Sequence, residues 1–581
     1  MSAPRRGKES RRRAAVRAPG DVTTPVPEAM TPPPAEVPPL RREAARMVPL
    51  AVLSGVLWFL SCASFDIWPL AWIAMVPALW TIDRASTRRR AILWAWIAGI
   101  VANAGGFYWI VGMLERFANL PTIAAVPIFL LLCAYQGVVF ALFGWAYHVL
   151  RAPRGDRPGL PAALAAPVTM VTFELAVPFI FPWYLAITQA WQRPVIQVAD
   201  LTGPLGVTAL LLVSNGAIYD LVFRRPRAWK PAIGAFAVLA LALVYGVTRM
   251  AQIDRRVTAA PKLAVGIVQP NVAFDQKART DGRRQQLTDL QAVSSRLERE
   301  GAELIVWPET AYPWVLPRDL AADLGEDKVA RVRRGFTVPL VMGALTNDDV
   351  HPHAFNSALL LDADGQFRAR FDKIFLLMFG EYIPLYDTIP WVRKLVPEAA
   401  GQLQRGEEIA TFPLTHDGRE VRLGPMICYE DILPAFGRKL GALNPHLLVN
   451  LTNDAWFGDT SEPWEHMALS VYRAVELRTG LVRAVNTGVS ASIDATGRVV
   501  KQTYAADPAI TPRPADGFVT QVSLLEGGHT VYQAVGDLFG YLNAAALAIL
   551  IFWQLRSAEK RTRRRGSAPP VSPTRKESED Q

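Results

Sequence analysis

Long apolar stretches alternate with short polar loops over the first part of the chain. Runs suited to crossing a membrane occupy residues 47–64, 67–82, 91–113, 122–150, 161–180, 200–223, 231–249 and, near the other end, 535–555. Each approaches the roughly 20 residues that an α-helix needs to span a hydrocarbon core of ~30 Å. The pattern therefore predicts about eight membrane-spanning helices, the first seven within residues 47–250 and the eighth at 535–556.

The pattern changes near Lys262, where short β-branched runs alternate with polar helical stretches. Such alternation is typical of an α/β domain with a mixed sheet. The segment is long enough to bury a core of its own, so residues 258–534 are predicted to form one domain. Its expected strands include 263–269, 304–307, 340–345, 358–362 and 447–451, and its expected helices include 286–301 and 464–477.

Composition agrees with a membrane protein. Of the 581 residues, 51% are hydrophobic and only 20% are charged, whereas soluble proteins usually carry about 25% charged residues. The tails at 1–46 and 557–581 are basic, and the first is also rich in proline. The first tail has too little apolar surface to fold by itself. We expect disorder there, and a solvated cytoplasmic tail is a simpler interpretation of the arginines than binding to nucleic acid.

Basic loops predict the orientation of the helices. Short loops rich in lysine and arginine stay in the cytoplasm, and such loops follow every second predicted span. Both basic tails then fall on the same side, which places residues 258–534 on the opposite, periplasmic side of a bacterial inner membrane. The loop residues concerned are Arg84, Arg88, Arg89, Arg90, Arg151, Arg154, Arg157, Arg224, Arg225, Arg227 and Lys230.

Three segments of the α/β domain carry candidate catalytic residues. Glu309 follows an apolar strand that ends in Trp307-Pro308, Lys373 stands in the segment Phe371-Asp372-Lys373-Ile374, and Cys428 follows a short apolar strand. Cys62 and Cys133 lie inside apolar runs, where a buried small side chain is the ordinary interpretation. Taken one at a time, Glu309, Lys373 and Cys428 also fit capping, solvation or packing. Together they supply the base, cation and nucleophile that thiol-based acyl transfer requires.

These segments resemble the nitrilase superfamily, whose Glu-Lys-Cys triad sits on an αββα sandwich. With the predicted spans, the chain further resembles the bacterial apolipoprotein N-acyltransferase family over about residues 47–555. The motifs that carry the resemblance are Trp307-Pro308-Glu309, Phe379-Gly380-Glu381-Tyr382-Ile383-Pro384, Ile427-Cys428-Tyr429-Glu430 and Asn453-Asp454-Ala455-Trp456-Phe457-Gly458. One departure is Phe274, which stands in the stretch where the family commonly has a tryptophan.

The resemblance implies transfer of an acyl chain from a phospholipid, through a thioester, to the free α-amine of an S-diacylglyceryl cysteine at the N-terminus of a lipoprotein. It implies Cys428 as nucleophile, Glu309 as base in both half-reactions and Lys373 as the group that stabilises the oxyanion. Glu381 and Glu430 are expected to hold Lys373 and shape the pocket. Three further residues are assigned less sharply: Tyr429 positions the nucleophile loop or contacts acyl chain, while Trp456 and Phe457 line a lipid entrance or form a buried aromatic corner.

The expected partners are a phospholipid donor, a diacylglyceryl apolipoprotein acceptor and the bilayer, with no nucleic acid, no cofactor and no metal. We expect a monomer. An amidase or lipid hydrolase using the same triad remains an alternative, as does a transporter or receptor with an inactive outer domain. The sequence contains no Gly-x-Ser-x-Gly, His-Glu-x-x-His or Walker A motif to support a serine hydrolase, zinc protease or nucleotide-driven enzyme.

Overall fold

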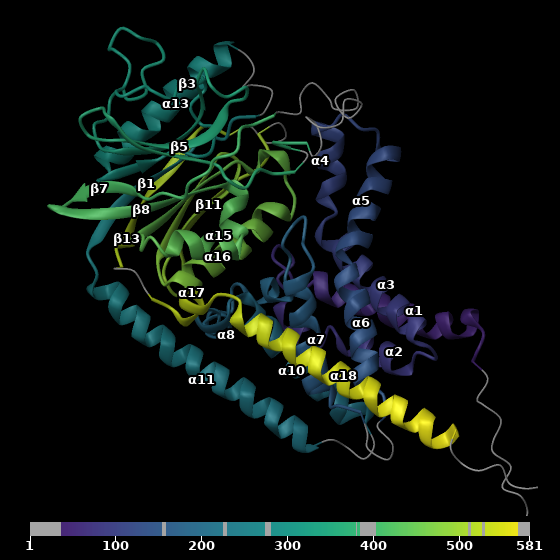
Figure 1. The fold of residues 1–581 in the computed structure, drawn as a ribbon. Coiled ribbons are helices and arrows are strands. Elements are labelled where there is room, and N and C mark those ends of the chain that lie inside the picture. The colour runs from purple at the N-terminus through teal and green to yellow at the C-terminus, as the bar shows by residue number, and fades with distance from the viewer. Residues whose placement is uncertain are drawn as a thin grey trace, which may run out of the picture.

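In the computed structural model, the chain forms a helical bundle and a two-sheet domain beside it (Figure 1). The structure describes residues 37–153, 159–224, 229–273, 280–378, 380–383, 402–508, 513–525 and 529–566. Residues 1–36 and 567–581 of the two predicted tails lie outside these described residues, and so does Phe274.

Ten main helices build the described part of the bundle, and they differ in how much of their apolar surface the protein covers. In α10, 72% of the most apolar window is buried, whereas in α11 and α18 only 17% is. Uncovered apolar side chains on that scale are typical of lipid-facing helices. The helices are α1 (Leu40–Phe59), α2 (Val76–Arg84), α3 (Arg88–Gly106), α4 (Trp109–Phe117), α5 (Thr122–Gln136), α6 (Val138–Arg151), α7 (Ala162–Ala176), α10 (Pro204–Phe223), α11 (Trp229–Ala259) and α18 (Leu538–Gly566).

Four helical segments of the described chain are long and apolar enough to cross a membrane: Thr122–Arg151, Pro204–Phe223, Trp229–Ala259 and Leu538–Arg556. A fifth results if α3 and α4, bent by 57°, count as one span. The expected span at 67–82 is divided between a 3-10 turn, η1 (Trp68–Trp72), and the short helix α2. The chain therefore has several membrane-compatible helices, while the count of eight stays a prediction.

Two mixed sheets form the domain, where the sequence pattern predicted one. The first runs β13-β1-β2-β4-β5-β6, with β3 paired to β4, and the second runs β12-β11-β10-β9-β8-β7. Parallel pairs lie at the centre of each sheet, and antiparallel pairs lie towards the edges. The strands are β1 (Lys262–Gln269), β2 (Leu304–Val306), β3 (Leu316–Pro317), β4 (Leu340–Asn347), β5 (Phe355–Leu361), β6 (Phe367–Asp372), β7 (Phe412–His416), β8 (Arg419–Ile427), β9 (Leu447–Thr452), β10 (Gly480–Val485), β11 (Gly488–Ile493), β12 (Val499–Ala505) and β13 (Asp516–Ser523).

The two sheets lie face to face between helices. β1 contacts β10 and β5 contacts β8 across the inner faces, while α13 (Thr280–Arg299) packs on β1, β2 and β13. On the opposite side, α16 (Glu462–Leu477) packs on β10 and β11, with α15 (Pro434–Gly441) beside it. Every residue of β9 and β10 is buried, as expected of central strands covered on both faces. The domain is thus the αββα sandwich that the resemblance implies.

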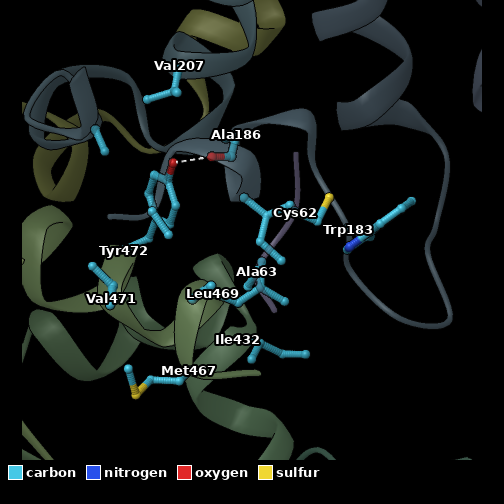
Figure 2. Packing of buried hydrophobic residues seen from close by; sticks show 14 of the residues in the cluster. Cys62, Ala63, Trp183, Ala186, Val207, Ile432, Met467, Leu469, Val471 and Tyr472 are labelled. Carbon is cyan, nitrogen blue, oxygen red and sulfur yellow. Dashed lines mark hydrogen bonds between the residues drawn. The ribbon is translucent and has the colours of Figure 1, made fainter. Parts of the chain in front are cut away.

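Helix α16 joins the domain to the bundle. Figure 2 shows Leu469 and Tyr472 of α16 in one hydrophobic cluster with Cys62 and Trp183 of the bundle. The Tyr472 hydroxyl donates a hydrogen bond to the carbonyl oxygen of Ala186 (Figure 2). The C-terminal end of α16 therefore has a fixed position against the bundle, and its N-terminal end lies beside the candidate site described next.

Candidate active site

Three loops bring the predicted triad together. Glu309 stands three residues after β2, Lys373 directly follows β6, and Cys428 directly follows β8. All three side chains are buried, with Lys373 only 1% exposed. β2 and β6 belong to the first sheet and β8 to the second, so the site forms only when the two sheets pack face to face.

Lys373 lies between two carboxylates. Its Nζ atom is 3.2 Å from Oε1 of Glu309 and 2.8 Å from Oε1 of Glu381. Asn356, on β5, donates from Nδ2 to the same two oxygens, at 2.7 Å and 3.2 Å. A lysine ammonium has three N–H groups, and the contacts among described residues engage two of them. One N–H of Lys373 is therefore available for an oxygen of a substrate.

Burial and charge set the protonation states of the triad. Burial opposes the charged form of Lys373, but Glu309 and Glu381 override it and hold the lysine pKa well above its usual range. Burial, followed by the nearby charge of Glu309, raises the pKa of the Cys428 thiol well above its ordinary value. Burial also raises the pKa of Glu309, against the opposing effect of Lys373. The resting site therefore combines a protonated thiol with a carboxyl of raised proton affinity, which suits a general base.

The backbone at Cys428 has an uncommon conformation. Its φ angle is +50°, in the left-handed region that non-glycine residues seldom adopt. The following residues begin the short helix η3 (Cys428–Ile432), so the cysteine sits at a sharp turn from strand to helix. Thr310, next to Glu309, also has a positive φ, of +46°. Such strain persists where the surrounding structure enforces it, and it is concentrated at functional sites.

Glu430 ties the lysine loop to the nucleophile strand. Its Oε1 accepts from the backbone N–H groups of Ile374, at 2.7 Å, and Phe375, at 3.1 Å, and its Oε2 accepts from that of Ile427, at 2.9 Å. Burial raises the Glu430 pKa to about 7 despite these donors. Because Ile374 follows Lys373 and Ile427 precedes Cys428, this carboxyl holds the two catalytic segments at a set separation.

The remaining predicted residues lie on the bundle side of Cys428. The Tyr429 hydroxyl donates to the carbonyl oxygen of Ile180 at 2.7 Å, so it anchors the nucleophile loop to the bundle. Phe457 is only 4% exposed and packs edge-on against Trp109, with 4.9 Å between ring centroids. The ring centroid of the half-buried Trp456 lies 4.4 Å from that of Phe117. These aromatic contacts form a corner between domain and bundle.

A mostly apolar cavity of about 40 Å³ adjoins the nucleophile. Its size admits a few water-sized groups. The sequence alone did not connect the bundle residues of this cavity with the triad, because more than 240 residues separate them from Cys428 along the chain. The lining includes Phe107, Trp109, Phe181, Pro182 and Trp183 from the bundle, and Leu377, Cys428, Tyr429, Ile432, Phe457, Glu462, Glu465, His466 and Leu469 from the domain.

A second buried charge cluster, which we call the aspartate cluster, lies behind Cys428. It consists of Asp431, Asp454, His466, Ser470 and Arg483. The His466 ring nitrogens face Asp431 Oδ1 at 2.8 Å and Asp454 Oδ1 at 3.1 Å. Ser470 Oγ donates to Asp431 Oδ2 at 2.6 Å, and Arg483 also binds that oxygen.

Three residues at this cluster have donor atoms close enough together to face one metal ion. Asp454, Glu462 and His466 place one ligand atom each within 4.8 Å of one another. Burial opposes the charged form of His466, but Asp431 raises its pKa to about 10, with Asp454 contributing. A protonated imidazole has no lone pair for a metal, and the Arg483 guanidinium is 3.8 Å from Asp454. These residues therefore fit an ion-pair network and do not fit a metal site.

Known protein families match both the helical bundle and the two-sheet domain. Residues 54–217 match the apolipoprotein N-acyltransferase N-terminal domain, and residues 264–508 match the carbon-nitrogen hydrolase domain. The apolipoprotein N-acyltransferase of Geobacter metallireducens is 32% identical over 521 residues, which cover 86% of this chain and 94% of that protein. The chain belongs to the apolipoprotein N-acyltransferase family. The family resemblance seen in the sequence is thereby confirmed, and the chain is an acyltransferase with a nitrilase-like catalytic domain.

Other relatives extend the comparison. The apolipoprotein N-acyltransferase of Bdellovibrio bacteriovorus is 29% identical over 469 residues, covering 78% of this chain and 85% of that protein. Among solved structures, an amidase of the nitrilase superfamily from Nesterenkonia AN1 is 19% identical, with a TM-score of 0.33, and covers 49% of this chain and 99% of that one.

Proposed function

We propose that this acyltransferase moves a fatty acyl chain from a phospholipid to the free α-amine of an S-diacylglyceryl cysteine at an apolipoprotein N-terminus, through a thioester on Cys428. The observation that carries the proposal is the site geometry: Lys373, held by Glu309 and Glu381, meets a buried cysteine beside an apolar cavity walled by the bundle. An enzyme that hydrolyses a small soluble amide would not require a cavity lined by residues of the helical bundle.

The first half-reaction forms the thioester. Glu309 takes the Cys428 proton while the sulfur attacks the ester carbonyl of the phospholipid, and the free N–H of Lys373 stabilises the oxyanion. The tetrahedral intermediate collapses as the bond between the carbonyl carbon and the ester oxygen breaks. The lysophospholipid leaves, and its new hydroxyl oxygen receives the proton from Glu309. Asn356 and Glu381 keep the Lys373 ammonium aimed at the carbonyl, and Glu430 keeps the lysine loop at its distance from the nucleophile.

The second half-reaction transfers the acyl chain. The acceptor α-amine attacks the thioester carbonyl, and Lys373 stabilises the second oxyanion in the same place. Glu309 takes a proton from the attacking nitrogen and returns it to the sulfur as the C–S bond breaks. The donor product leaves before the acceptor binds, so the cycle is ping-pong and needs no cofactor. Tyr429 and Phe457 line the cavity beside the thioester, and Trp456 belongs to the aromatic corner next to it.

The membrane arrangement is part of the proposal. Eight spans, seven within residues 47–250 and one at 535–556, place the domain of residues 258–534 on the periplasmic face of the inner membrane, with both tails in the cytoplasm and the enzyme a monomer. Reporter fusions at Gly365 and at the C-terminus are expected to report opposite compartments. Reports from one compartment would overturn this topology.

A product assay separates transfer from hydrolysis, since both would use the same triad. Purified enzyme receives phospholipid and a diacylglyceryl peptide with a free α-amine, and N-acylated peptide and free fatty acid are measured together. We expect N-acylated peptide as the main product. A matched peptide with an acetylated α-amine controls for other acceptors and is expected to remain unmodified. Free fatty acid without acylated peptide would instead identify a lipid hydrolase.

A further inference from the structure

Two glutamates of α16 line the cavity beside Cys428 and have no part in the triad. Glu462 and Glu465 stand in the first two turns of the helix, and they are 8% and 4% exposed. Among the described residues, Oε2 of Glu462 and Oε1 of Glu465 have no hydrogen-bond partner. A buried carboxylate oxygen without a partner is unfavourable. Of the donors in the described part of the chain, Glu465 has only the Ser461 hydroxyl and the Trp109 indole nearby, so both side chains have room for a further donor from a ligand.

The surroundings of the pair favour a cationic ligand. Facing Glu462 are Asp454, Glu465, His466 and Arg483, and behind them lies Asp431. In the aspartate cluster, the charges of His466 and Arg483 are matched by Asp431 and Asp454. His466 Nδ1 also lies 3.7 Å from Oε1 of Glu462, but His466 and Arg483 are two cations facing four carboxyls, so ionised Glu462 and Glu465 would leave excess negative charge. An ammonium group would neutralise it, whereas the phosphate of a phospholipid would be repelled.

We propose that Glu462 and Glu465 are the acceptor-amine site: they hold the α-ammonium of the incoming lipoprotein beside the Cys428 thioester, and Glu465 removes its first proton. This inference rests on the proposed acyl transfer and completes it. An α-ammonium must lose one proton before it can attack and a second as the amide forms. Glu309 handles the second proton, while its Oε1 is already engaged by Asn356 and Lys373.

The proton transfers balance. The ammonium passes one proton to the Glu465 carboxylate, and the resulting amine forms the C–N bond with the thioester carbonyl. As the C–S bond breaks, the nitrogen gives up its second proton, which Glu309 delivers to the Cys428 sulfur. The products are an amide, a regenerated thiol and a neutral Glu465, which releases its proton to water when the product leaves.

The proton affinities of the two groups are matched. Burial raises the Glu465 pKa to about 8, although the Ser461 hydroxyl and Trp109 indole nearby favour its charged form. An α-amino group has a pKa of ~7.7–8.0 in model peptides. Transfer between groups of similar pKa is nearly isoenergetic, which is the condition that favours acid–base catalysis. Burial and Asp454 also raise the Glu462 pKa well above its ordinary value, so both carboxyls are mostly protonated before the ammonium binds and ionise when it lies beside them.

Single-turnover transfer tests the inference. Wild-type enzyme, Glu465→Gln and Glu462→Gln are first acylated with phospholipid, and acyl-enzyme is quantified by mass spectrometry. The diacylglyceryl peptide is then added at pH 6.5 and at pH 9. We expect normal acyl-enzyme in both variants, and transfer in Glu465→Gln slowed by about 20-fold at pH 6.5, because only ~5% of an α-amine with a pKa of ~7.8 is neutral there without a base. At pH 9 the amine is already neutral, so the deficit should largely disappear. Glu462→Gln is expected mainly to raise the peptide concentration needed for half-maximal rate.

Two controls make the result specific. Glu476→Gln alters another buried glutamate of α16, whose pKa burial raises to about 7. Unlike Glu465, this residue pairs with Arg473 and does not line the cavity. The transfer rate of this variant should not show the pH-dependent loss. Hydroxylamine, a neutral acceptor, should cleave the acyl-enzyme of wild type and Glu465→Gln equally.

The outcomes separate this inference from the proposed function. Normal acyl-enzyme with wild-type transfer at pH 6.5 in Glu465→Gln would overturn the inference alone, and so would a deficit of equal size at both pH values. Absence of acyl-enzyme in the wild type would overturn the thioester route and the inference with it.

Discussion

Two buried charge clusters flank Cys428, and they differ in whether a hydrogen-bond donor remains available to a substrate. Around Lys373, one cation serves two carboxylates, and contacts with the described residues leave one of its N–H groups for substrate. In the aspartate cluster, both His466 nitrogens and both Asp431 oxygens have partners within the cluster. The cluster atoms without a hydrogen-bond partner among the described residues, Asp454 Oδ2 and Arg483 Nε and Nη2, belong to a facing ion pair. The first arrangement is suited to stabilising a transient charge. The second joins η3, α16 and β10, and so fixes the position of the segment that carries the nucleophile.

The largest expected effect comes from the base in the cluster around Lys373. Glu309→Gln keeps the shape of the side chain and removes its proton affinity, so acyl-enzyme formation should fall by ~10²–10⁴, the usual contribution of a general base. Thioester formation from phospholipid, followed by mass spectrometry, measures the loss. If acylation were unaffected, the base would have to be assigned elsewhere.

Removing the cation should have the next largest effect. Lys373→Ala eliminates the donor to the oxyanion, and loss of one such stabiliser lowers the rate by ~10²–10³. Acylation and peptide transfer should decline together, because both pass through an oxyanion in the same position. A loss confined to one half-reaction would contradict a shared oxyanion site. Thermal unfolding of the variant checks that the domain remains folded.

The aspartate cluster should respond in stability. Arg483→Met removes one of the two cations that face the fully buried Asp431, the other being His466, and breaking a buried pair typically costs ~3–5 kcal/mol. The control Arg498→Met breaks a half-exposed pair with Asp254, worth at most ~1 kcal/mol. Unfolding temperature in detergent measures both. Acylation per folded molecule should fall less in Arg483→Met than the ~10² expected from losing an oxyanion donor. A larger fall with unchanged stability would give this cluster a catalytic role.

The smallest expected effect is a dependence of stability on pH. Asp431 and Asp454, working against burial, raise the His466 pKa to about 10 from its usual 6.5. The folded protein thus keeps a proton that the unfolded chain releases above pH ~6.5, so this stabilisation is complete below pH 6.5 and is lost as pH rises towards 10. Unfolding temperature should decline over that range less steeply in His466→Gln than in the wild type. Equal slopes would contradict a charged His466.

Much of the catalytic domain could be predicted from local sequence. Strands such as β1, β4 and β9, and helices such as α13 and α16, lie where the hydrophobic pattern predicted them. Glu309 and Cys428 were expected after strands, and the chemistry of a base, a cation and a nucleophile grouped them with Lys373; the structure brings the three side chains together. Their catalytic roles stay predictions. Local patterns suffice here because the spacing of hydrophobic residues within one short segment distinguishes a strand from a helix.

Contacts between distant segments could not be predicted in this way. Asn356 sits in an apolar strand with nothing to link it to Glu309, and Trp109 and Trp183 belong to the bundle yet line the cavity at Cys428. Of the two arrangements expected for Phe457, the buried corner is present, because Trp109 covers it. The bend between α3 and α4 was also absent from the hydrophobic pattern, which treated them as one run.

The thioester on Cys428 can be tested directly by mass spectrometry. Enzyme purified in detergent is incubated with phospholipid in the absence of peptide, digested, and analysed with and without neutral hydroxylamine. We expect a fatty-acyl mass on the peptide that contains Cys428, removed by hydroxylamine and missing in Cys428→Ser, whose hydroxyl a lone carboxylate activates poorly. An acyl group on another residue, or wild-type peptide acylation by Cys428→Ser, would show that the nucleophile lies elsewhere.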